Sequence, residues 1–419
     1  MKAVELEIAE RTLANGITCI AVRSRGVPTF AATVALRSGQ VEEGPREHGL
    51  AYLTGSLLEE GTRQRDAVEL AESIEALGAA LECSGGGATI HCPAEEAQKA
   101  VRLLHEVVLE PRFDPREVRR VQGEIAAEID AEDADPRSVA RKRFRAEAYG
   151  EHPLGRPHYG SRSAIAAYRA ADLVRFHRKW FVPHDTIVAA AGPMETEETL
   201  DLLAKTFRAF RGERPERHEV PPVVMPGARR DIHLPMDREQ VHVMLGHPGI
   251  RRSDPDFVAL AVMDHVLGSG PGFTSRIGKK LRDEQGLCYS VHASITSGAG
   301  LEPSLFYAYI GTSPEHRQRA IDGFLAEIHA IRDTLPSADE LRDVQDYLTG
   351  SWVFGLERNS NLVGFAVRSK RYGLGPDWLQ RYPELVRAVT REEVQRVARL
   401  HLDPERVVVV SAGAGTARA

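Results

Sequence analysis

The stretch FHRKWFVPHDTIVAAAG, residues 176–192, decides the fold, because its order returns as ARLHLDPERVVVVSAG at residues 398–413. Each stretch has the pattern of a helix end, a turn at a proline and a buried strand that ends in glycine. The step along the chain from Pro183 to Pro404 equals the step from Gly192 to Gly413. This constant offset predicts two homologous domains.

Each half begins with strand-like segments and continues with long amphipathic helices. The predicted strands are residues 17–22, 31–37 and 242–246, and the clearest predicted helices are residues 67–77, 94–108, 116–130, 255–267, 314–334 and 338–354. Strands grouped with helices predict an α+β fold with one α/β sandwich in each half. Residues 211–230 are rich in Pro, Arg and Glu and lack periodicity. We therefore expect domains at residues 1–212 and 231–419, joined by a linker at residues 213–230.

Composition excludes several classes of protein. The 419 residues are 42% hydrophobic and 27% charged, with a net charge of -6, which is ordinary for a folded globular chain and gives no basic face for nucleic acid. Acidic residues interrupt the N-terminal segment, and no run of about 18 apolar residues occurs, so we expect no membrane contact and a cytoplasmic location. The four cysteines are scattered, which favours buried thiols over a metal clip.

Residues 49–62, GLAYLTGSLLEEGT, resemble the signature of the M16 (pitrilysin-like, inverted zincin) metallopeptidases. In that family a helix reading G-L-A-H-F-L-E-H-x-L-x-x-G-T carries two zinc-ligand histidines and a general-base glutamate. Here Tyr52 and Ser56 stand at the histidine positions, and Gly55 stands at the glutamate position. A neutral hydroxyl is a poor zinc ligand, and glycine cannot accept a proton from water. We therefore expect no metal in this chain and no peptide cleavage by this chain alone.

Two further stretches of the first half resemble the same family. The segments PRF at 111–113, VQGEIAAEI at 121–129 and DP at 135–136 resemble the region of the third zinc ligand, and the resemblance places Glu128 at that position. Residues 152–160, HPLGRPHYG, resemble the H-P-L-G-R-P-x-x-G stretch of the family almost letter for letter. The resemblance therefore extends well beyond one degenerate motif.

In the second half, LRDEQGLCYSV at residues 281–291 resembles the family's L-R-E-x-x-G-L-x-Y-S-V run. The resemblance implies that Arg282 and Tyr289 face the active site from the second domain, where they hold the substrate backbone and stabilise the oxyanion. Both side chains are hydrogen-bond donors, which suits that role. Without the family resemblance, a surface arginine and a strand tyrosine in ordinary structural positions are the simpler interpretation.

Two glycine-rich stretches depart from known ligand motifs. Residues 268–276, GSGPGFTSR, contain Gly268, Gly270 and Gly272 but lack the Lys-Ser/Thr ending of a phosphate-binding loop. They stand where the family has a G-G-G-x-x-S-R-L turn, and we expect a flexible loop that contacts substrate or partner. Residues 84–87, SGGG, stand where the family has a substrate-binding edge strand. Their composition makes an ordered peptide contact there doubtful.

The resemblance implies two M16-type α/β sandwich domains of the LuxS/metallopeptidase-like kind, facing each other like a clam shell. It favours a non-catalytic subunit of a heterodimeric peptidase, which supplies Arg282, Tyr289 and half of a peptide-enclosing chamber to a partner that carries H-x-x-E-H and the zinc. One alternative is a catalytically dead structural or peptide-binding relative, either homodimeric or like a core subunit. A third hypothesis is a hydrolase with displaced ligands, such as Glu128 with His48 or His91, which has too few ligands in the expected places.

Overall fold

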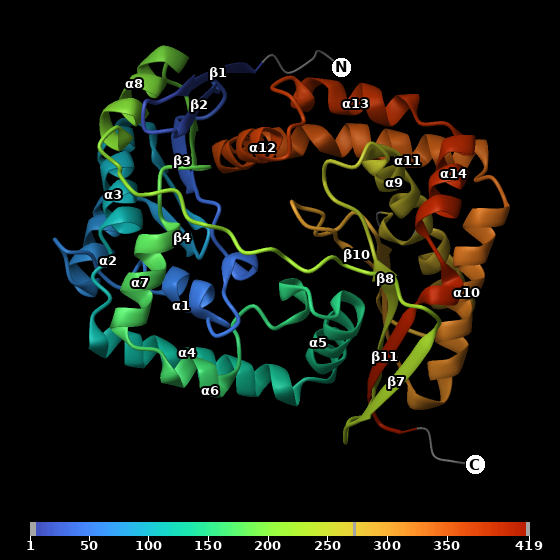
Figure 1. Ribbon diagram of the computed structural model, residues 1–419. Helices are drawn as coiled ribbons and strands as arrows, with labels where there is room; N and C mark the ends of the chain where they lie inside the picture. Colours follow the sequence, from blue (N-terminus) through green and yellow to red (C-terminus); the bar gives the residue numbers. More distant parts are fainter. Residues whose placement is uncertain (1–5, 271–273, 416–419) are drawn as a thin grey trace. The chain divides into compact units, whose positions relative to one another are not determined.

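The computed structural model describes residues 6–270 and 274–415, and the chain forms two compact units (Figure 1). Unit 1 comprises Met1–Ile129, Pro157–Val220 and Val353–Gln380, and unit 2 comprises Asp130–Arg156, Pro221–Trp352 and Arg381–Ala419. Each unit contains one mixed β-sheet with helices. The predicted α+β fold with two similar sandwiches is therefore confirmed.

Unit 1 is built on a six-stranded sheet with the order β1-β2-β6-β3-β5-β4. Its strands are β1 (Glu7–Thr12), β2 (Thr18–Arg23), β3 (Thr29–Ala35), β4 (Ala80–Ser84), β5 (Gly87–Pro93) and β6 (Ile187–Gly192). Strands β2 and β6 run parallel, and the other neighbours run antiparallel.

Helices cover both faces of this sheet. Helices α3 (Ala97–Leu109) and α8 (Thr196–Phe207) pack on one set of side chains, and α12 (Asn359–Arg371) packs on the other. In β3, Phe30 and Val34 join the core that contains α3, whereas Ala31 joins the core that contains α12. Because alternate residues point to opposite faces, burial of both faces requires nearly continuous apolar strands.

Unit 2 is built on a five-stranded sheet with the order β7-β11-β8-β10-β9. Its strands are β7 (Arg230–Pro235), β8 (Val241–Pro248), β9 (Val291–Ser294), β10 (Leu305–Thr312) and β11 (Val408–Gly413). Helix α5 (Pro136–Tyr149) packs on β8 and β11, and α10 (Arg317–Asp333) packs on β8 and β10. Helices α9 (Phe257–Asp264) and α14 (Arg391–His401) contact each other, and α14 contacts α10.

The sheets repeat one topology. Without β1, the order β2-β6-β3-β5-β4 corresponds to β7-β11-β8-β10-β9, and the parallel pair stands at the same place in each. Helix α7 (Ala170–Trp180) precedes β6, and α14 starts and ends at the same offset from α7 as Pro404 has from Pro183. The two homologous domains predicted from the repeated stretches are therefore confirmed.

The predicted helices also form, with shifts of a few residues at their ends. The remaining α-helices are α1 (Leu50–Ser56), α2 (Ala67–Ala76), α4 (Pro115–Ala134), α6 (Arg162–Ala167), α11 (Ala338–Ser351) and α13 (Trp378–Ala388). Residues 208–229, all of them described, form neither helix nor strand. The predicted limits at 212 and 231 stay a prediction, as does the clam-shell arrangement.

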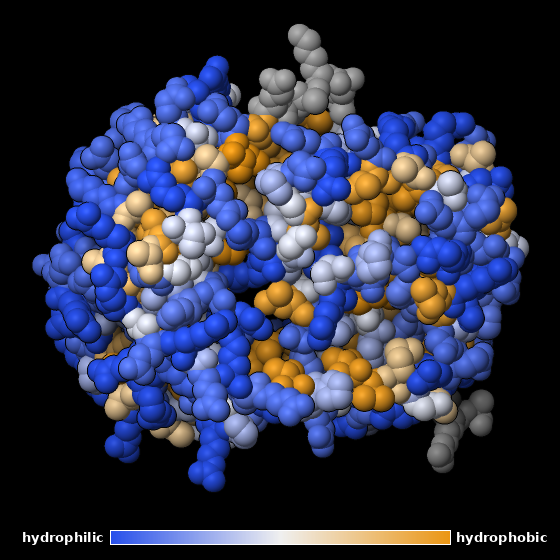
Figure 2. Space-filling view, turned by 45° about the horizontal axis from the view of Figure 1, so that its top comes forward, coloured by the Kyte–Doolittle hydropathy of each residue, from blue (hydrophilic) through white to orange (hydrophobic). Residues whose placement is uncertain are grey.

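Polar and charged side chains cover most of the face drawn in Figure 2, with scattered apolar patches. Within the described residues, no helix is both long enough and apolar enough to cross a membrane. All four cysteines are free; Cys19 and Cys92 are buried, and Cys83 and Cys288 are partly buried. Burial raises the pKa of the Cys92 thiol to about 11, so this thiol stays protonated near neutral pH.

Candidate functional site

The degenerate motif forms a short helix, α1, whose start is fixed by packing and by one buried carboxylate. Gly49 has a φ of 85°, and a Cβ atom there would lie 2.2 Å from the carbonyl oxygen of Tyr159. Only glycine fits this position. The carboxylate of Glu43, which is 3% exposed, accepts hydrogen bonds from the amides of Gly49 (3.1 Å) and Ala51 (2.8 Å). Glu43 thereby satisfies amides at the positive end of the helix.

Tyr52 lies against Glu128, and both residues stand at positions that the resemblance aligns with zinc ligands of the family. Its hydroxyl donates a hydrogen bond of 3.0 Å to Oε2 of Glu128, which projects from α4. The Tyr52 ring also packs edge-on against the His158 ring, at a centroid distance of 4.8 Å. The structure therefore brings α1 and α4 together through a neutral hydroxyl and a carboxylate.

Ser56 bonds to its own helix. Its Oγ donates to the backbone oxygen of Tyr52, one turn earlier, at 3.1 Å. This local bond is typical of a serine inside a helix. The hydroxyl proton of Ser56 is therefore donated to the backbone of α1 itself.

Gly55 is in close contact with the β4–β5 turn. A Cβ atom at Gly55 would lie 2.3 Å from the nitrogen of Gly85 and 2.3 Å from the carbonyl carbon of Ser84. A Cβ atom at Gly85 would in turn lie 2.5 Å from the carbonyl oxygen of Ala51. The turn therefore fills the space into which a side chain at position 55 would extend.

These residues do not fit a zinc ion. A catalytic zinc needs about three protein ligands drawn from His, Glu, Asp and Cys, plus an open position, whereas this site offers one carboxylate, Glu128, that already accepts a hydrogen bond from Tyr52. We therefore derive no metal-dependent step for the α1 site.

The displaced-ligand hypothesis gains no support. Among residues 6–270 and 274–415, the one group of three His, Cys, Asp or Glu residues close enough to share a metal is Asp254, Asp256 and His401. The guanidinium of Arg396 bonds both carboxylate oxygens of Asp256, at 2.7 and 3.2 Å, and chiefly this bond lowers the pKa of Asp256. Glu128 does not form such a group with His48 or His91.

Arg282 and Tyr289 both lie in unit 2, just before β9. Arg282 projects from the short helical segment η5 (Gly278–Glu284), and its Nε and Nη2 atoms donate to Oδ1 of Asp283 at 2.9 and 2.6 Å. The Tyr289 side chain is 95% exposed. Between them, burial raises the pKa of Cys288 to about 11, and the charge of Arg282 opposes that rise. The two residues thus differ in environment, one ion-paired and one fully accessible.

The expectation of a flexible loop is wrong for Gly268 and Ser269, which lie in the helical segment η4 (His265–Ser269) and pack along β9. A Cβ atom at Gly268 would lie 2.6 Å from Cβ of Ala293, and one at Gly270 would lie 2.7 Å from the carbonyl oxygen of His265. Ser269 donates from Oγ to the carbonyl oxygen of Ala293 at 2.7 Å. Gly272 falls outside the described residues. The end of η4 therefore lies against β9, and a contact of residues 268–276 with substrate or partner stays a prediction.

The HPLGRP segment begins in unit 2, directly after α5. Tyr149, which precedes it, donates from its hydroxyl to the carbonyl oxygen of Pro303 at 2.9 Å. His152 is buried, and its Nδ1 accepts a hydrogen bond from the amide of Leu154 at 3.2 Å. This segment therefore joins the end of α5 to the loop that precedes β10.

Two important residues carry no motif in the sequence: Glu43 binds the start of α1, as described above, and Asp264 is buried at the end of α9. Gly85 lies in the glycine-rich stretch 84–87, but that stretch did not predict its contact with α1. The carboxylate of Asp264 accepts hydrogen bonds from the hydroxyls of Ser294 (2.6 Å) and Thr296 and from the amides of Ile295 and Thr296 (both 2.9 Å). The one hint in the sequence is that Asp264 directly follows an apolar run in α9, where a charged residue is unexpected.

Comparison with known proteins identifies the family. Residues 19–162 match the model described as Insulinase (Peptidase family M16), and residues 168–348 match the Peptidase M16 inactive domain. An uncharacterized zinc protease of Mycobacterium tuberculosis is 28% identical over 405 residues, which cover 95% of this chain and 91% of that protein. A Helicobacter pylori protein named non-peptidase homolog YmxG is 23% identical over 375 residues, covering 88% and 85%.

Solved structures share the fold. A crystal structure of a peptidase M16 inactive domain from Pseudomonas fluorescens superposes with a TM-score of 0.92 and 24% identity, covering 99% of this chain and all of that chain. A protease from Helicobacter pylori superposes with a TM-score of 0.87 and 19% identity, covering 97% of this chain and all of that one. Two family models in the order of the two halves, together with this fold, identify the chain as a member of the peptidase M16 family.

Proposed function

We propose that the chain is the non-catalytic subunit of a heterodimeric M16 zinc peptidase. It supplies Arg282, Tyr289 and half of a peptide-enclosing chamber to a partner that carries H-x-x-E-H and the zinc. The observation that carries this proposal is the α1 site, where Tyr52 donates to Glu128 and Gly55 lies against the Ser84–Gly85 backbone. A cytoplasmic location and the absence of nucleic-acid partners belong to the same proposal.

The state of Arg282 and Tyr289 supports a role toward another molecule. Tyr289 is 95% exposed, so its phenol can reach a peptide without a change in packing. Arg282 is held by Asp283, which orients a guanidinium whose planar fork of N–H donors suits a substrate carbonyl. Donors held in place in this way stabilise a developing oxyanion by roughly 3 kcal/mol each.

A structural or peptide-binding M16 relative without chemistry is the second candidate. It is favoured by the name of the Helicobacter pylori relative, a non-peptidase homolog. The two candidates differ in one respect: only the first requires that a zinc-binding partner lose activity when Arg282 or Tyr289 is changed.

The test mixes the purified chain with an H-x-x-E-H chain from the same source and measures peptide cleavage. Arg282→Ala is expected to lower kcat about 100-fold and Tyr289→Phe at least tenfold, because each removes a donor to the oxyanion. The matched controls are Arg319→Ala, whose exposed guanidinium bonds Gln285, and Tyr347→Phe, whose side chain is 40% exposed. Equal activity for all four variants would favour the second candidate.

A further inference from the structure

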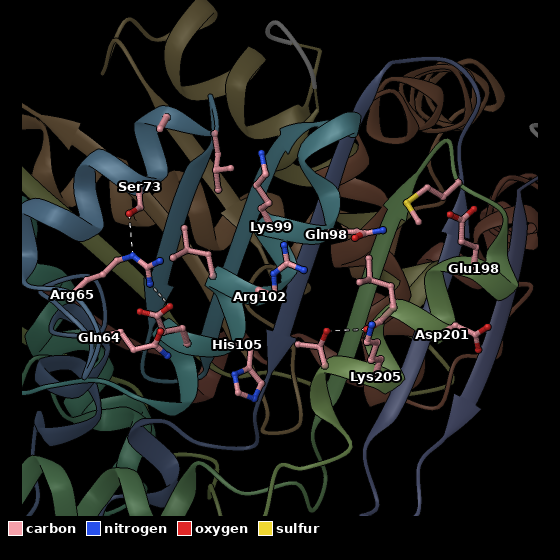
Figure 3. A pocket seen from close by; sticks show the side chains of 17 residues that line it. Gln64, Arg65, Ser73, Gln98, Lys99, Arg102, His105, Glu198, Asp201 and Lys205 are labelled. Carbon is pink, nitrogen blue, oxygen red and sulfur yellow. Dashed lines mark hydrogen bonds and ion pairs between the residues drawn. The ribbon is translucent and has the colours of Figure 1, made fainter.

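Unit 1 carries a cavity of about 980 Å³ that shares no residue with the α1 site (Figure 3). Helices α2, α3 and α8 border it, and its volume lies at the upper end of the range typical of binding sites. Its apolar lining comes from Leu103, which is 5% exposed, and from Leu77, Met194 and Leu202, which pack against the core of unit 1. The cavity thus offers an apolar floor on a rigid base.

Cationic side chains surround this floor. Lys99 and Arg102 project from α3, and Lys205 projects from α8 (Figure 3). Lys99 pairs with Glu96 at 2.7 Å, whereas neither Arg102 nor Lys205 has an ion-pair partner among the described residues. Of the acidic groups on α8 that line the cavity, Asp201 is already bound by Arg11 at 2.7 Å, which leaves Glu198.

One further cation is held in a fixed orientation. Arg65 pairs with Glu106, whose side chain is 9% exposed, and donates from Nε to Oγ of Ser73 at 3.1 Å. Thr62 donates to the other oxygen of Glu106. A guanidinium with its partners in place loses little conformational freedom on binding. Arg65 is therefore an ordered arginine beside α2, and Arg102 on α3 and Lys205 on α8 add two cations that lack an ion-pair partner in the described part of the chain.

We propose that this cavity docks an acidic amphipathic helix of a partner protein. The apolar face of that helix packs on Leu103, Leu202 and Met194, and its carboxylates pair with Arg102 and Lys205. A groove between neighbouring helices suits the i, i+3, i+4 anchors of such a segment, and the cationic rim favours an acidic occupant. In unit 1, helix α8 follows β6 and forms one wall of the cavity. The corresponding strand of unit 2 is β11, and no helix follows it within the described residues, so unit 2 has no such wall.

The test uses a 20-residue helical probe peptide with leucines on one face and glutamates on the other, and a matched peptide with Gln in place of Glu. Fluorescence anisotropy with the full-length chain is expected to give a Kd at least tenfold lower for the acidic peptide at low salt, with the advantage lost as salt rises. The double variant Arg102→Glu/Lys205→Glu should remove the advantage. The matched control Arg175→Glu on α7, whose partner is Asp172, should retain it.

Hydrogen exchange locates the peptide independently of the substitutions. Protection on α2, α3 and α8 is expected with the acidic peptide. Equal binding of both peptides, full binding by the double variant, or protection confined to other helices would each overturn the proposal. None of these results depends on peptidase activity, so this docking site and the proposed heterodimer can fail separately.

Discussion

The two units differ in how a helix is held against the edge strand of the sheet. In each unit, the helix that follows the central strand, α1 or α9, meets the end of an edge strand, β4 or β9. In unit 1 this contact is made by bare backbone, with Gly55 against Ser84 and Gly85. In unit 2 it is made by the carboxylate of Asp264, which collects four hydrogen bonds from residues 294–296.

The difference lies in the groups that make the contact between helix and edge strand. At Gly55, which the resemblance aligns with the family's glutamate, the β4–β5 turn leaves no room for a side chain. Unit 2 has a buried carboxyl group at the equivalent contact, where burial raises the pKa of Asp264 and the donors from Ser294 and Thr296 act against that rise. Backbone packing in unit 1 and a buried polar network in unit 2 therefore fix the corresponding edge strands of two similar sheets.

The largest expected effect comes from removing the buried carboxylate. Asp264→Ala leaves two hydroxyls and two amides without an acceptor, and we expect it to lower the free energy of unfolding by about 4 kcal/mol. Urea denaturation measures this. The control Asp343→Ala, an aspartate with a 71% exposed side chain, should change stability by less than about 0.5 kcal/mol. Similar values for both variants would mean that Asp264 does not hold the edge.

The next effect tests the glycine contact in unit 1. Alanine normally stabilises a helix by about 1 kcal/mol relative to glycine, but at Gly55 its Cβ would meet backbone at 2.3 Å. Gly55→Ala should therefore cost about 2 kcal/mol. Gly123→Ala, on α4 with nothing within 4 Å, should gain up to about 1 kcal/mol. A gain at both positions would show that the turn does not fill the site.

The next expected effect is a pH dependence of the free energy of unfolding that comes from unit 1. His177 on α7 is largely buried against Phe113 and Phe181, and burial lowers its pKa to about 4. The unfolded chain takes up this proton near pH 6.5 and the folded chain does not, so stability should fall on the order of 2 kcal/mol between pH 6.5 and pH 4. The corresponding position in the second copy of the repeat is Ala398, so this response belongs to unit 1.

His177→Gln should flatten the pH dependence of the urea midpoint over that interval, because glutamine retains a donor for the Val108 carbonyl but does not titrate. His329→Gln, at a histidine with a 49% exposed side chain, should leave the profile unchanged. An identical slope for the parent and His177→Gln would contradict the assignment.

The smallest effect concerns the hydrogen bond between Tyr52 and Glu128. Tyr52→Phe removes the bond to Glu128 and keeps the ring packing against His158. Because Glu128 remains solvated, we expect a loss of about 0.5 kcal/mol. Calorimetric unfolding checks this. A loss several times larger would indicate that the pair is a structural anchor of unit 1.

Local sequence patterns were sufficient for the elements and for the repeat. The constant offset between the two stretches places α7 and α14, and β6 and β11, correctly, because period and turn chemistry are local properties. Thr390 and Glu393 form a capping box at the start of α14, with hydrogen bonds of 2.8 and 3.1 Å, and this motif too is local. The resemblance aligned Tyr52 and Glu128 with two ligand positions of the family, and the side chains of these two residues are hydrogen-bonded to each other.

Long-range packing could not be predicted in the same way. Helix α5 belongs to unit 2 and α12 to unit 1, although each lies in the other half of the sequence. Each helix has an apolar stripe that predicts burial but not which sheet covers it. The contact of Gly55 with Gly85 and the donors around Asp264 likewise depend on residues distant in the sequence. Such contacts are set by the fold as a whole.

The central claim is that this chain has no zinc site of its own and completes the site of another chain. The most direct measurement is zinc content and peptidase activity for the purified chain alone and in mixture with an H-x-x-E-H chain from the same source. The account predicts that the chain alone is free of stoichiometric zinc and inactive, and that activity rises in the mixture above that of the partner alone. Stoichiometric zinc with activity in the chain alone would contradict it.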